Sequence, residues 1–425
     1  MFIYRLPMKK IKLFLLSFFV VGSLMAQQLA FPGADGFGKY AKGGRVGTVY
    51  HVTNLNDTGT GSFRDAVSQP KRAVVFDIAG VINIKSKIIV QSEITIAGQT
   101  APGEGITVYG DGISINGKSN IICRYMRFRG SIHMSKGTCT VAIDSSQYVI
   151  FDHTSIEWGR WDNLHVKNSK DVTLQYCIVG EGIDPQMFGA LLERPTDLTI
   201  HHCLWINNQS RNPKAKSDIE YINNVVYNWG SNCFVGGHSA AEYHQDIINN
   251  YFIAGPNSSK NFISEFKATD HVYQSGNLVD QNKDGLLNGK LVTEDDFKKT
   301  GATVEVNRYN VSMNTMTIQK PVDAFIVVLT EAGSSLHRDK VDIRLINCLK
   351  SLGKAGTIIK SEAEVGGQPN ILTAKGLKDT DGDGIPDVWE TAHKLNPKDP
   401  ADGDKITSNG YSNLEMYLNG LVEKH

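Results

Sequence analysis

Short apolar runs alternate with polar turns rich in Asn and Gly through the middle of the chain. The runs cover residues 94–97, 120–128, 148–156, 172–179, 198–205, 219–226 and 246–252. When the runs are aligned, one column contains His153, Cys177, Cys203, Asn224 and Asn250, at spacings of 24, 26, 21 and 26 residues. A period in the twenties, with strands and no helices between them, is typical of a β-solenoid whose coils bury their faces against one another.

The unequal spacing predicts an all-β fold, a right-handed parallel β-helix with three strands per coil and loops of variable length. In such a fold one column becomes a ladder of stacked side chains, so Asn223 and Asn224 would pair their amides with Asn249 and Asn250. A β-sandwich or a propeller would instead need hairpin turns and longer, blade-like periods. The 41 glycines and 13 prolines suit a turn-rich β protein.

Residues 1–26 have the features of a secretory signal peptide. Four basic residues precede an apolar run at 13–22, and a small residue, Ala26, stands at the expected cleavage site. The run is shorter than the roughly 20 apolar residues that a membrane anchor needs. We therefore expect a secreted protein, periplasmic or extracellular, without a membrane span.

The net charge and the spacing of the cysteines limit the classes of function that the protein can have. Removal of the signal peptide changes the balance from 44 basic and 44 acidic residues to 40 and 44, a net charge of about −4. A nucleic-acid-binding domain is strongly basic, so we expect no nucleic-acid partner, while a local basic site for an acidic polysaccharide remains compatible with this charge. The six cysteines lack metal-type spacing and are expected to be core residues in a monomer.

The domain boundaries follow changes in the pattern. Residues 27–285 form the predicted β-helix domain, and a short helix at 62–67 is expected to cover an open end of the solenoid. Residues 286–375 form a tail with flanking helix and loops, in which positions 341, 343, 345, 346 and 349 have helical spacing. Residues 376–425 are predicted to be a separate EF-hand-like unit.

The segment 379–390 fits the twelve-position calcium loop at every ligand place. Carboxylates occupy positions 1, 3, 5, 9 and 12, a glycine occupies position 6, and a backbone carbonyl serves position 7. The predicted Ca²⁺ ligands are Asp379, Asp381, Asp383, Ile385, Asp387 and Glu390. The helix that usually enters such a loop is missing, so we expect a structural role. A second loop around Asp402 and Asp404 is degenerate.

A basic stretch at 208–216 lies between two of the apolar runs. It places Arg211, Lys214 and Lys216 within six residues, beside Pro213. A basic loop is usually a solvated surface, but here it interrupts the solenoid pattern at a single coil. The stretch is therefore a candidate site for an anionic ligand.

Several motifs occur in order between residues 30 and 280. They are Phe-Pro-Gly-Ala-Asp-Gly-Phe-Gly at 31–38, Val-Thr-Asn-Leu-Asn-Asp-Thr-Gly-Thr-Gly-Ser-Phe-Arg at 52–64, Phe-Asp-His-Thr-Ser-Ile-Glu-Trp-Gly at 151–159, Ser-Arg-Asn-Pro at 210–213 and Asn-Asn-Val-Val-Tyr-Asn-Trp-Gly at 223–230. This series resembles the bacterial pectate lyase family of parallel β-helices, and looser matches follow at 336–342 and 364–367.

The resemblance implies cleavage of polygalacturonate by β-elimination. A base removes the proton on C5, the uronate carboxylate is stabilised as it gains charge, and the C4 oxygen leaves. Such chemistry needs cations where the negative charge develops. Arg211 matches the catalytic arginine of the family and Lys216 a second basic residue. Arginine is a demanding base because guanidinium rarely loses its proton.

The same resemblance suggests residues that bind substrate. The candidates are Lys214, Asp152, His153, Trp158, Arg194 and His238. Asp152 and His153 are similar to an Asp-His pair of the family, and aromatic faces such as that of Trp158 stack on sugar rings.

The chain departs from the family at the catalytic calcium. Cys139, Phe188 and Leu192 occupy places where calcium-dependent members have carboxylates. Two alternatives remain open at this point. Calcium is held by other acids, with Asp162, Glu181 and Asp184 as candidates, or a cation takes its place, as in the related pectin lyases, with Arg194, Arg160 and Lys167 as candidates.

Two other functions compete with a lyase. A glycoside hydrolase on the same fold would use paired carboxylates, with candidates among Asp152, Asp162, Glu181 and Asp184. A glycan-binding β-helix that has lost catalysis is the third hypothesis, and the missing calcium carboxylates favour it.

Overall fold

The computed structural model describes residues 1–2, 27–312 and 317–423. The predicted signal peptide, apart from its first two residues, lies outside the described residues. None of the described helices combines the length and the hydrophobicity that crossing a bilayer requires.

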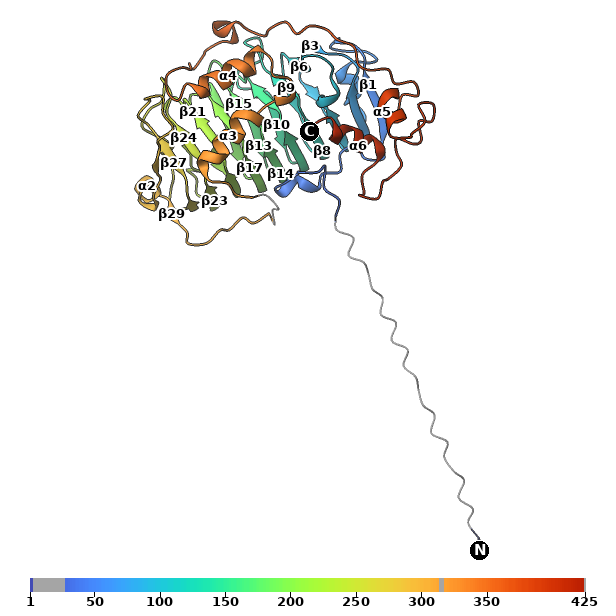
Figure 1. The fold of residues 1–425 in the computed structure, drawn as a ribbon. Coiled ribbons are helices and arrows are strands. Elements are labelled where there is room, and N and C mark those ends of the chain that lie inside the picture. The colour runs from blue at the N-terminus through green and yellow to red at the C-terminus, as the bar shows by residue number, and fades with distance from the viewer. Residues whose placement is uncertain (3–26, 313–316, 424–425) are drawn as a thin grey trace.

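Three sheets of parallel strands wind into a solenoid, with one strand of each sheet in most coils (Figure 1). Sheet 1 has 11 strands: β1 (Thr48–Val52), β2 (Arg72–Phe76), β5 (Ile94–Ala97), β8 (Ser119–Arg124), β11 (Gln147–Asp152), β14 (Lys170–Gln175), β17 (Thr196–His201), β20 (Ile219–Ile222), β23 (Tyr243–Ile248), β26 (Asp270–Ser275) and β29 (Thr303–Val304). Sheet 2 has 10: β3 (Gly80–Asn83), β6 (Ile106–Tyr109), β9 (Arg127–Arg129), β12 (Ser155–Glu157), β15 (Ile178–Gly180), β18 (Leu204–Ile206), β21 (Val225–Tyr227), β24 (Tyr251–Ile253), β27 (Leu278–Asp280) and the antiparallel β28 (Lys290–Leu291).

Sheet 3 has 8 strands: β4 (Ile88–Ile89), β7 (Ile113–Ser114), β10 (Val141–Asp144), β13 (Asp162–Lys167), β16 (Phe188–Glu193), β19 (Lys214–Lys216), β22 (Phe234–Val235) and β25 (Ile263–Ser264). The helices are η1 (Phe37–Tyr40), α1 (Phe63–Ala66), η2 (Gly98–Thr100), α2 (Glu294–Thr300), α3 (Pro321–Glu331), η3 (Ser335–His337), α4 (Lys340–Lys350), η4 (Glu362–Val365), α5 (Asp387–Ala392) and α6 (Asn413–Gly420). The right-handed parallel β-helix predicted from the sequence is confirmed.

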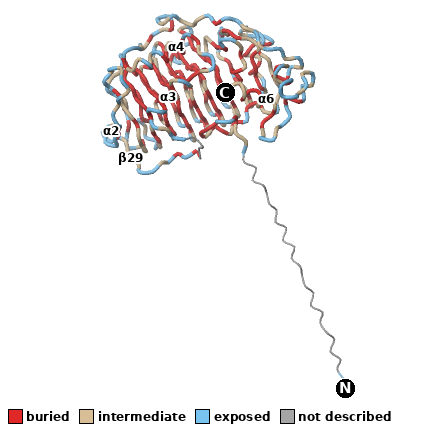
Figure 2. Tube along the Cα trace, in the orientation of Figure 1, coloured by how far each residue is buried: buried red, intermediate tan, exposed pale blue. Residues whose placement is uncertain are grey.

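Alternate residues of each strand fill the inside of the solenoid, as the period of a β-strand requires. On β11 and β14, for example, Val149 and Phe151 stand beside Val172 and Leu174, and all four are fully buried. The buried strands form the continuous centre of Figure 2. All six cysteines are free thiols, so they form no disulfide framework, and the prediction of core residues is confirmed for the five that are buried.

From β8 to β27, each coil turns from sheet 1 to sheet 2 within two residues. The first turn residue has a left-handed backbone, with φ of 49° at His153, 52° at Tyr176 and 51° at His202. These rings stack, with centroids 4.8 Å apart for His153 and Tyr176 and 5.2 Å apart for Tyr176 and His202. They form an outer column, and the second turn residues form a separate inner column.

The inner column is the predicted ladder. The Asn224 amide N donates to Asn250 Oδ1 at 2.8 Å, and the Asn250 amide N donates to Asn277 Oδ1 at 2.9 Å. Their side-chain amides also pair along the stack, at 3.1 and 2.9 Å. The predicted column is wrong by one residue at His153, because the inner position of that turn belongs to Thr154.

Two helices cover the outer face of sheet 2. Phe325 and Val328 of α3 pack in one apolar cluster with Leu345 of α4 and with Leu204 and Val225 of the sheet. Figure 1 shows both helices lying across these strands. The helical spacing predicted α4, whereas α3 was not predicted.

A buried ionic cluster fixes the start of α4 to sheet 2. The guanidinium of Arg129, with no exposed surface, contacts Asp339 at 2.5 Å, Asp342 at 2.8 Å and Glu157 at 2.9 Å. Asp339 also caps α4 by accepting from the amides of Val341 and Asp342. Because a buried charge is costly unless it is paired, this cluster ties the outer helix to one register on the solenoid.

The last part of the chain packs on the outer face of sheet 1, over its first strands. Ile385, Leu414 and Leu418 form an apolar cluster with Ala73 and Val75 of β2. Two polar contacts flank this cluster. Arg45 Nε donates to Glu415 Oε1 at 2.7 Å, and Arg124 Nη1 donates to Asn419 Oδ1 at 3.1 Å. The predicted helix at 62–67 is confirmed as α1, with the Ser62 hydroxyl accepting from the amide of Asp65.

Candidate active site

The basic stretch lies on the outer face of sheet 3. In β19 the side chain of Ala215 is buried in the core, so its neighbours Lys214 and Lys216 project outward on both sides of it. Lys216 stands beside Glu193 of β16, and Glu193 beside Lys167 of β13. The outer face of sheet 3 therefore carries a row of alternating charges.

The backbone at Arg211 is held between the preceding and the following coil. The Ala190 amide donates to the Arg211 carbonyl at 2.8 Å, and the Asn212 amide donates to the Cys233 carbonyl at 2.9 Å. Arg211 has a φ of 60°, which is uncommon for a residue with a side chain. Gly189 makes the close approach feasible, because a Cβ at that position would lie 2.4 Å from the Arg211 carbonyl oxygen.

Three buried asparagines are linked by hydrogen bonds beneath the Arg211 loop. Asn163 Nδ2 donates to Asn208 Oδ1 at 3.1 Å, and Asn208 Nδ2 donates to Asn212 Oδ1 at 2.9 Å. All three side chains are at most 1% exposed. The first of these hydrogen bonds joins two coils, and together they favour one conformation of the loop, because buried amides are costly without partners.

The Arg211 side chain lies between a carboxylate and an aromatic ring. Arg211 Nη1 is 3.2 Å from both oxygens of Asp162, and its guanidinium carbon is 4.2 Å from the ring centroid of Phe188. Asp162 has no exposed surface, while the Arg211 side chain is 21% exposed. The guanidinium is thus fixed on its inner side and open to solvent on its outer side.

The Asp162 carboxyl is electrostatically unusual. Burial raises its pKa to about 7, against the opposing influence of Arg211 and Lys214. A carboxyl with this pKa changes its charge near neutral pH, which alters the field at Arg211. Lys214 Nζ also contacts Glu265 Oε2 at 3.0 Å.

Two other predicted substrate residues lie on the same face. Arg194 follows β16 directly and has a side chain that is 56% exposed, with Nε donating to Asn168 Oδ1 at 3.2 Å. His238 is exposed three residues after Val235, which pairs with Lys214. The structure therefore places Lys214 and Lys216 on sheet 3, Arg211 in the loop before β19, and Arg194 and His238 in the loops after β16 and β22.

Three predicted substrate residues lie elsewhere. Asp152 and His153 are at the turn from sheet 1 to sheet 2, where they line a separate cavity of about 470 Å³. The Asp152 carboxylate is engaged by Arg124 at 2.7 Å and by His153 at 2.7 Å. Trp158 has no exposed surface, and its Nε1 donates to Glu181 Oε2 at 3.2 Å. A buried ring offers no face to a sugar, so Trp158 is a packing residue here.

The acids suggested for an active-site calcium do not come together. Asp162 contacts Arg211, and the buried Glu181 forms an ion pair with Arg344 at 2.5 Å. Asp184 lies 3.5 Å from Arg160. Within the described part of the chain, the groups of three acids close enough to share an ion are all in the C-terminal unit. These three acids therefore do not fit a calcium ion.

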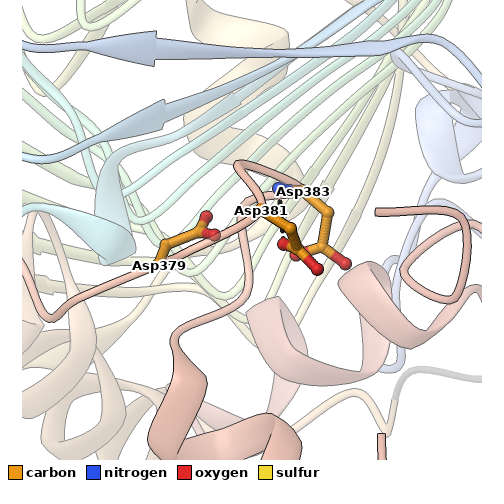
Figure 3. A group of neighbouring side chains, drawn as sticks. All are labelled: Asp379, Asp381 and Asp383. Atoms are coloured by element: carbon orange, nitrogen blue, oxygen red, sulfur yellow. Dashed lines mark hydrogen bonds between the residues drawn. The ribbon is translucent and has the colours of Figure 1, made fainter. Parts of the chain in front are cut away.

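The C-terminal loop gathers most of its predicted ligands. Figure 3 shows Asp379, Asp381 and Asp383 on one loop, and one oxygen from each lies within 4.8 Å of the others. Glu390 is fully buried and has no hydrogen-bond partner for either carboxylate oxygen. Burial and the neighbouring acids together raise the pKa of Asp383 and of Glu390 to about 7. Buried carboxylates without partners fit a cation.

Asp387 was predicted to be a calcium ligand, but its carboxylate is engaged by other groups. Its carboxylate accepts from the Thr380 amide at 2.7 Å and from Lys378 Nζ at 2.9 Å. Two groups of three acids in this unit are close enough to share an ion: Asp379, Asp381 and Asp383 form one, and Asp383, Glu390 and Asp402 form the other. Asp387 belongs to neither group, whereas Asp402 of the degenerate loop belongs to the second. The sequence pattern did not distinguish these two acids, because both stand at positions where calcium loops have oxygen ligands.

Two supporting features were not predicted. Phe188 was regarded only as a departure from a calcium site, yet its ring is the surface on which Arg211 rests. The role of Asn163 and Asn208 depends on contacts between coils, 45 residues apart for this pair. No local signal in the sequence indicates such contacts.

Fold and site together define a parallel β-helix with an arginine–lysine surface site on one sheet rather than an enclosed pocket. A scan against models of protein families finds no match. Among curated proteins, the probable pectate lyase C of Aspergillus flavus is 40% identical over 396 residues, which are 93% of this chain and 94% of that protein. The corresponding protein of Aspergillus fumigatus is 41% identical over the same length. The chain belongs to the pectate lyase family.

Solved structures agree on the fold. A thermostable pectate lyase has a TM-score of 0.55 at 13% identity and covers 73% of this chain and 98% of its own. A variant of the Bacillus subtilis pectate lyase also has a TM-score of 0.55 at 13% identity, with 73% and 99% covered. This likeness concerns the architecture of the β-helix.

Proposed function

We propose that this protein is a secreted polysaccharide lyase that cleaves a galacturonate-containing glycan by β-elimination on the outer face of sheet 3. The observation that carries the proposal is the placement of Arg211. Its guanidinium is fixed by Asp162 and Phe188 on one side and open to solvent on the other, next to two outward-facing lysines. Membership of the pectate lyase family supports the reaction class.

In the proposed reaction Arg211, in its neutral guanidine form, takes the proton from C5 of a uronate residue and becomes a guanidinium. The electrons of the broken C5–H bond form the C4–C5 double bond, and the C4 oxygen leaves with its electron pair. Negative charge develops on the uronate carboxylate during this step, so fixed cations near that carboxylate lower the barrier. Lys214 and Lys216 are on the next strand segment after Arg211 and are suited to this role.

An open surface suits a polymeric substrate. A chain that extends past the site on both sides needs a face along which it can lie, and sheet 3 presents its strands side by side for this purpose. Arg194 and His238, exposed on neighbouring coils, are proposed to contact sugar residues on either side of the reacting one. The fixed cations of this face, including Lys167, are proposed to neutralise uronate groups in place of an active-site calcium.

Calcium is proposed to bind in the C-terminal unit. Asp379, Asp381, Asp383 and Glu390 supply carboxylates, and Ile385 supplies its backbone carbonyl. The ion would neutralise buried carboxylates that otherwise repel one another, and its role there is structural. The predicted signal peptide supports export, and an acidic polysaccharide is the proposed partner.

The function is tested by product analysis. The mature protein is incubated with polygalacturonate, methyl-esterified pectin and rhamnogalacturonan, with and without chelator, and the ultraviolet absorbance of the unsaturated product is followed. We expect absorbance to rise with at least one of these glycans. New reducing ends without absorbance would indicate hydrolysis, and binding without any product would indicate a glycan-binding module.

A further inference from the structure

The second, degenerate loop of the C-terminal unit delivers one acid to the first loop. Asp402 is only 3% exposed, and its Oδ2 accepts from the Asn396 amide at 2.8 Å. Its backbone carbonyl accepts from Asn413 Nδ2 at 2.8 Å, at the start of α6. The Asp402 side chain is therefore fixed from both ends, and its other oxygen, Oδ1, has no hydrogen-bond partner.

The two loops approach so closely that only glycine fits between them. A Cβ on Gly403, the residue after Asp402, would lie 2.3 Å from Asp383 Oδ2. One carboxylate oxygen each of Asp383, Glu390 and Asp402 lies within 4.8 Å of the others. The structure thus brings an acid of the second loop to two ligands that the sequence predicts for the first.

The unpartnered oxygens of these acids favour a cation between them. Asp383 is 5% exposed and Glu390 fully buried, and Asp383 Oδ2, both oxygens of Glu390 and Asp402 Oδ1 have no partner. Three buried carboxylates at this separation repel one another strongly unless a cation lies between them. Oxygen ligands from carboxylates are those that calcium prefers.

We propose that Asp402 is a direct ligand of the calcium ion of the 379–390 loop, so that both loops share one ion. This inference rests on the proposed calcium site and changes its ligand set. Asp402 takes the place that the loop pattern gives to Asp387, whose carboxylate is engaged by Thr380 and Lys378. In the described part of the chain both acidic groups contain Asp383, which agrees with one centre rather than two.

A shared ion would join the two halves of the C-terminal unit. Asp383 and Glu390 flank Ile385 in the first half, and Asp402 precedes Leu414 in the second. Ile385 and Leu414 pack in one cluster with Val75 of sheet 1. The ion would therefore fix the spacing of two apolar contacts on the solenoid, and its loss would weaken both of them.

The test uses terbium, which replaces calcium at oxygen sites and is sensitised by a nearby indole. Trp389 adjoins the ligand Glu390 in α5, so its excitation reports on this unit in the full-length mature protein. Trp389→Phe assigns the signal to the unit. The wild-type protein is expected to bind one terbium ion per chain with this signal, and calcium is expected to displace it.

Two matched variants then separate the ligands. Asp402→Asn keeps an oxygen for the Asn396 amide and removes the second carboxylate oxygen, whereas Asp404→Asn removes an acid of the same loop outside the cluster. We expect Asp402→Asn to weaken calcium affinity by at least about tenfold and Asp404→Asn by less than about twofold. The calcium-induced rise in Tm, measured on the same samples, is expected to fall in Asp402→Asn only.

Distinct results would overturn the inference. Calcium affinity of Asp402→Asn within twofold of wild type, or equal losses in both variants, would remove Asp402 from the ligand set and leave the calcium site itself intact. If Asp402→Asn is unfolded without calcium, the calcium concentration at which the protein folds is measured for Asp402→Ser and for Asp404→Asn, and a higher requirement in Asp402→Ser alone is expected. A wild-type protein without Trp389-dependent terbium signal would contradict the calcium site as a whole.

Discussion

Arg211 Nη1 lies 3.2 Å from both carboxylate oxygens of Asp162, a side chain without exposed surface. Replacing Arg211 by Ala is expected to lower kcat by roughly a hundredfold to ten-thousandfold, the range of a lost general base. Its Tm should change little below pH 7, because Asp162 can then be neutral. Initial rates of absorbance increase and a thermal melt check both statements.

Arg194→Ala is the matched control for that variant. Arg194 is an exposed arginine on the same face, and its loss should alter KM more than kcat. An Arg211→Ala protein that retains wild-type kcat would contradict the assignment of the base.

Asp162 is proposed to position Arg211, and its charge state should be visible in the pH profile. Asp162→Asn keeps the shape of the side chain and removes its titration. We expect kcat to fall about tenfold with little change in KM, because the guanidinium loses its anchor. The wild-type kcat should show an inflection near pH 7, where Asp162 changes its charge, and the variant should lack it. An unchanged profile would mean that Asp162 acts only as packing.

Gly189→Ala tests the backbone of the site. A Cβ there would lie 2.4 Å from the Arg211 carbonyl oxygen and 3.1 Å from Asn208 Nδ2, so the loop must shift. We expect kcat to fall about tenfold or more while the far-ultraviolet circular dichroism stays that of a β-helix. Gly420→Ala, where a Cβ meets nothing within 4 Å, is the control and should be fully active. Full activity of Gly189→Ala would show that the loop adapts without cost.

We expect His202, in the outer column of rings, to make the stability of the folded protein sensitive to acid. Burial lowers the pKa of His202 to about 4, and its Nε2 pairs with Gln319 Oε1 at 3.0 Å. The unfolded chain binds a proton there below pH 6.5, whereas the folded chain stays neutral down to about pH 4. The free energy of unfolding should therefore fall as pH decreases through this window, by up to about 3 kcal/mol from this group.

His202→Asn should reduce that loss, because the next coil already has Asn223 at the equivalent turn position. The loss of stability is measured as the difference between the denaturant midpoints at pH 7 and pH 4.5, for wild type and for His202→Asn. His271→Asn serves as the comparison, since hydrogen bonds to Glu305 and Glu242 raise the pKa of His271 and give its titration the opposite sign. Equal acid sensitivity of wild type and His202→Asn would contradict this origin.

Much of the fold is encoded locally and was predictable. The apolar period identified the solenoid, and the Asn pairs identified the inner ladder, because inward positions repeat once per coil whatever the loop length. The error at His153 arose because a two-residue turn places one side chain outward and the next inward. A polar residue in the sequence does not show whether it occupies the outward or the inward position of the turn.

The site was less predictable for a physical reason. Arg211 was predicted from its local motif, but its anchors come from other coils. Asp162 precedes it by 49 residues, and Glu181 is neutralised by Arg344 from 163 residues away. The sequence shows that acids exist, and only the packing of coils and outer helices shows which of them are already paired.

The packing of Ile385, Leu414 and Leu418 on Ala73 and Val75 also has a consequence for the order of folding. The strand that carries this patch, β2, is synthesised well before the residues that cover it, in α6 and just before α5. A chain interrupted before residue 376 would leave the patch open to water and to other chains. Residues 376–423 thus cover this face only after the strands of the β-helix have been synthesised, and chains that lack them are expected to associate.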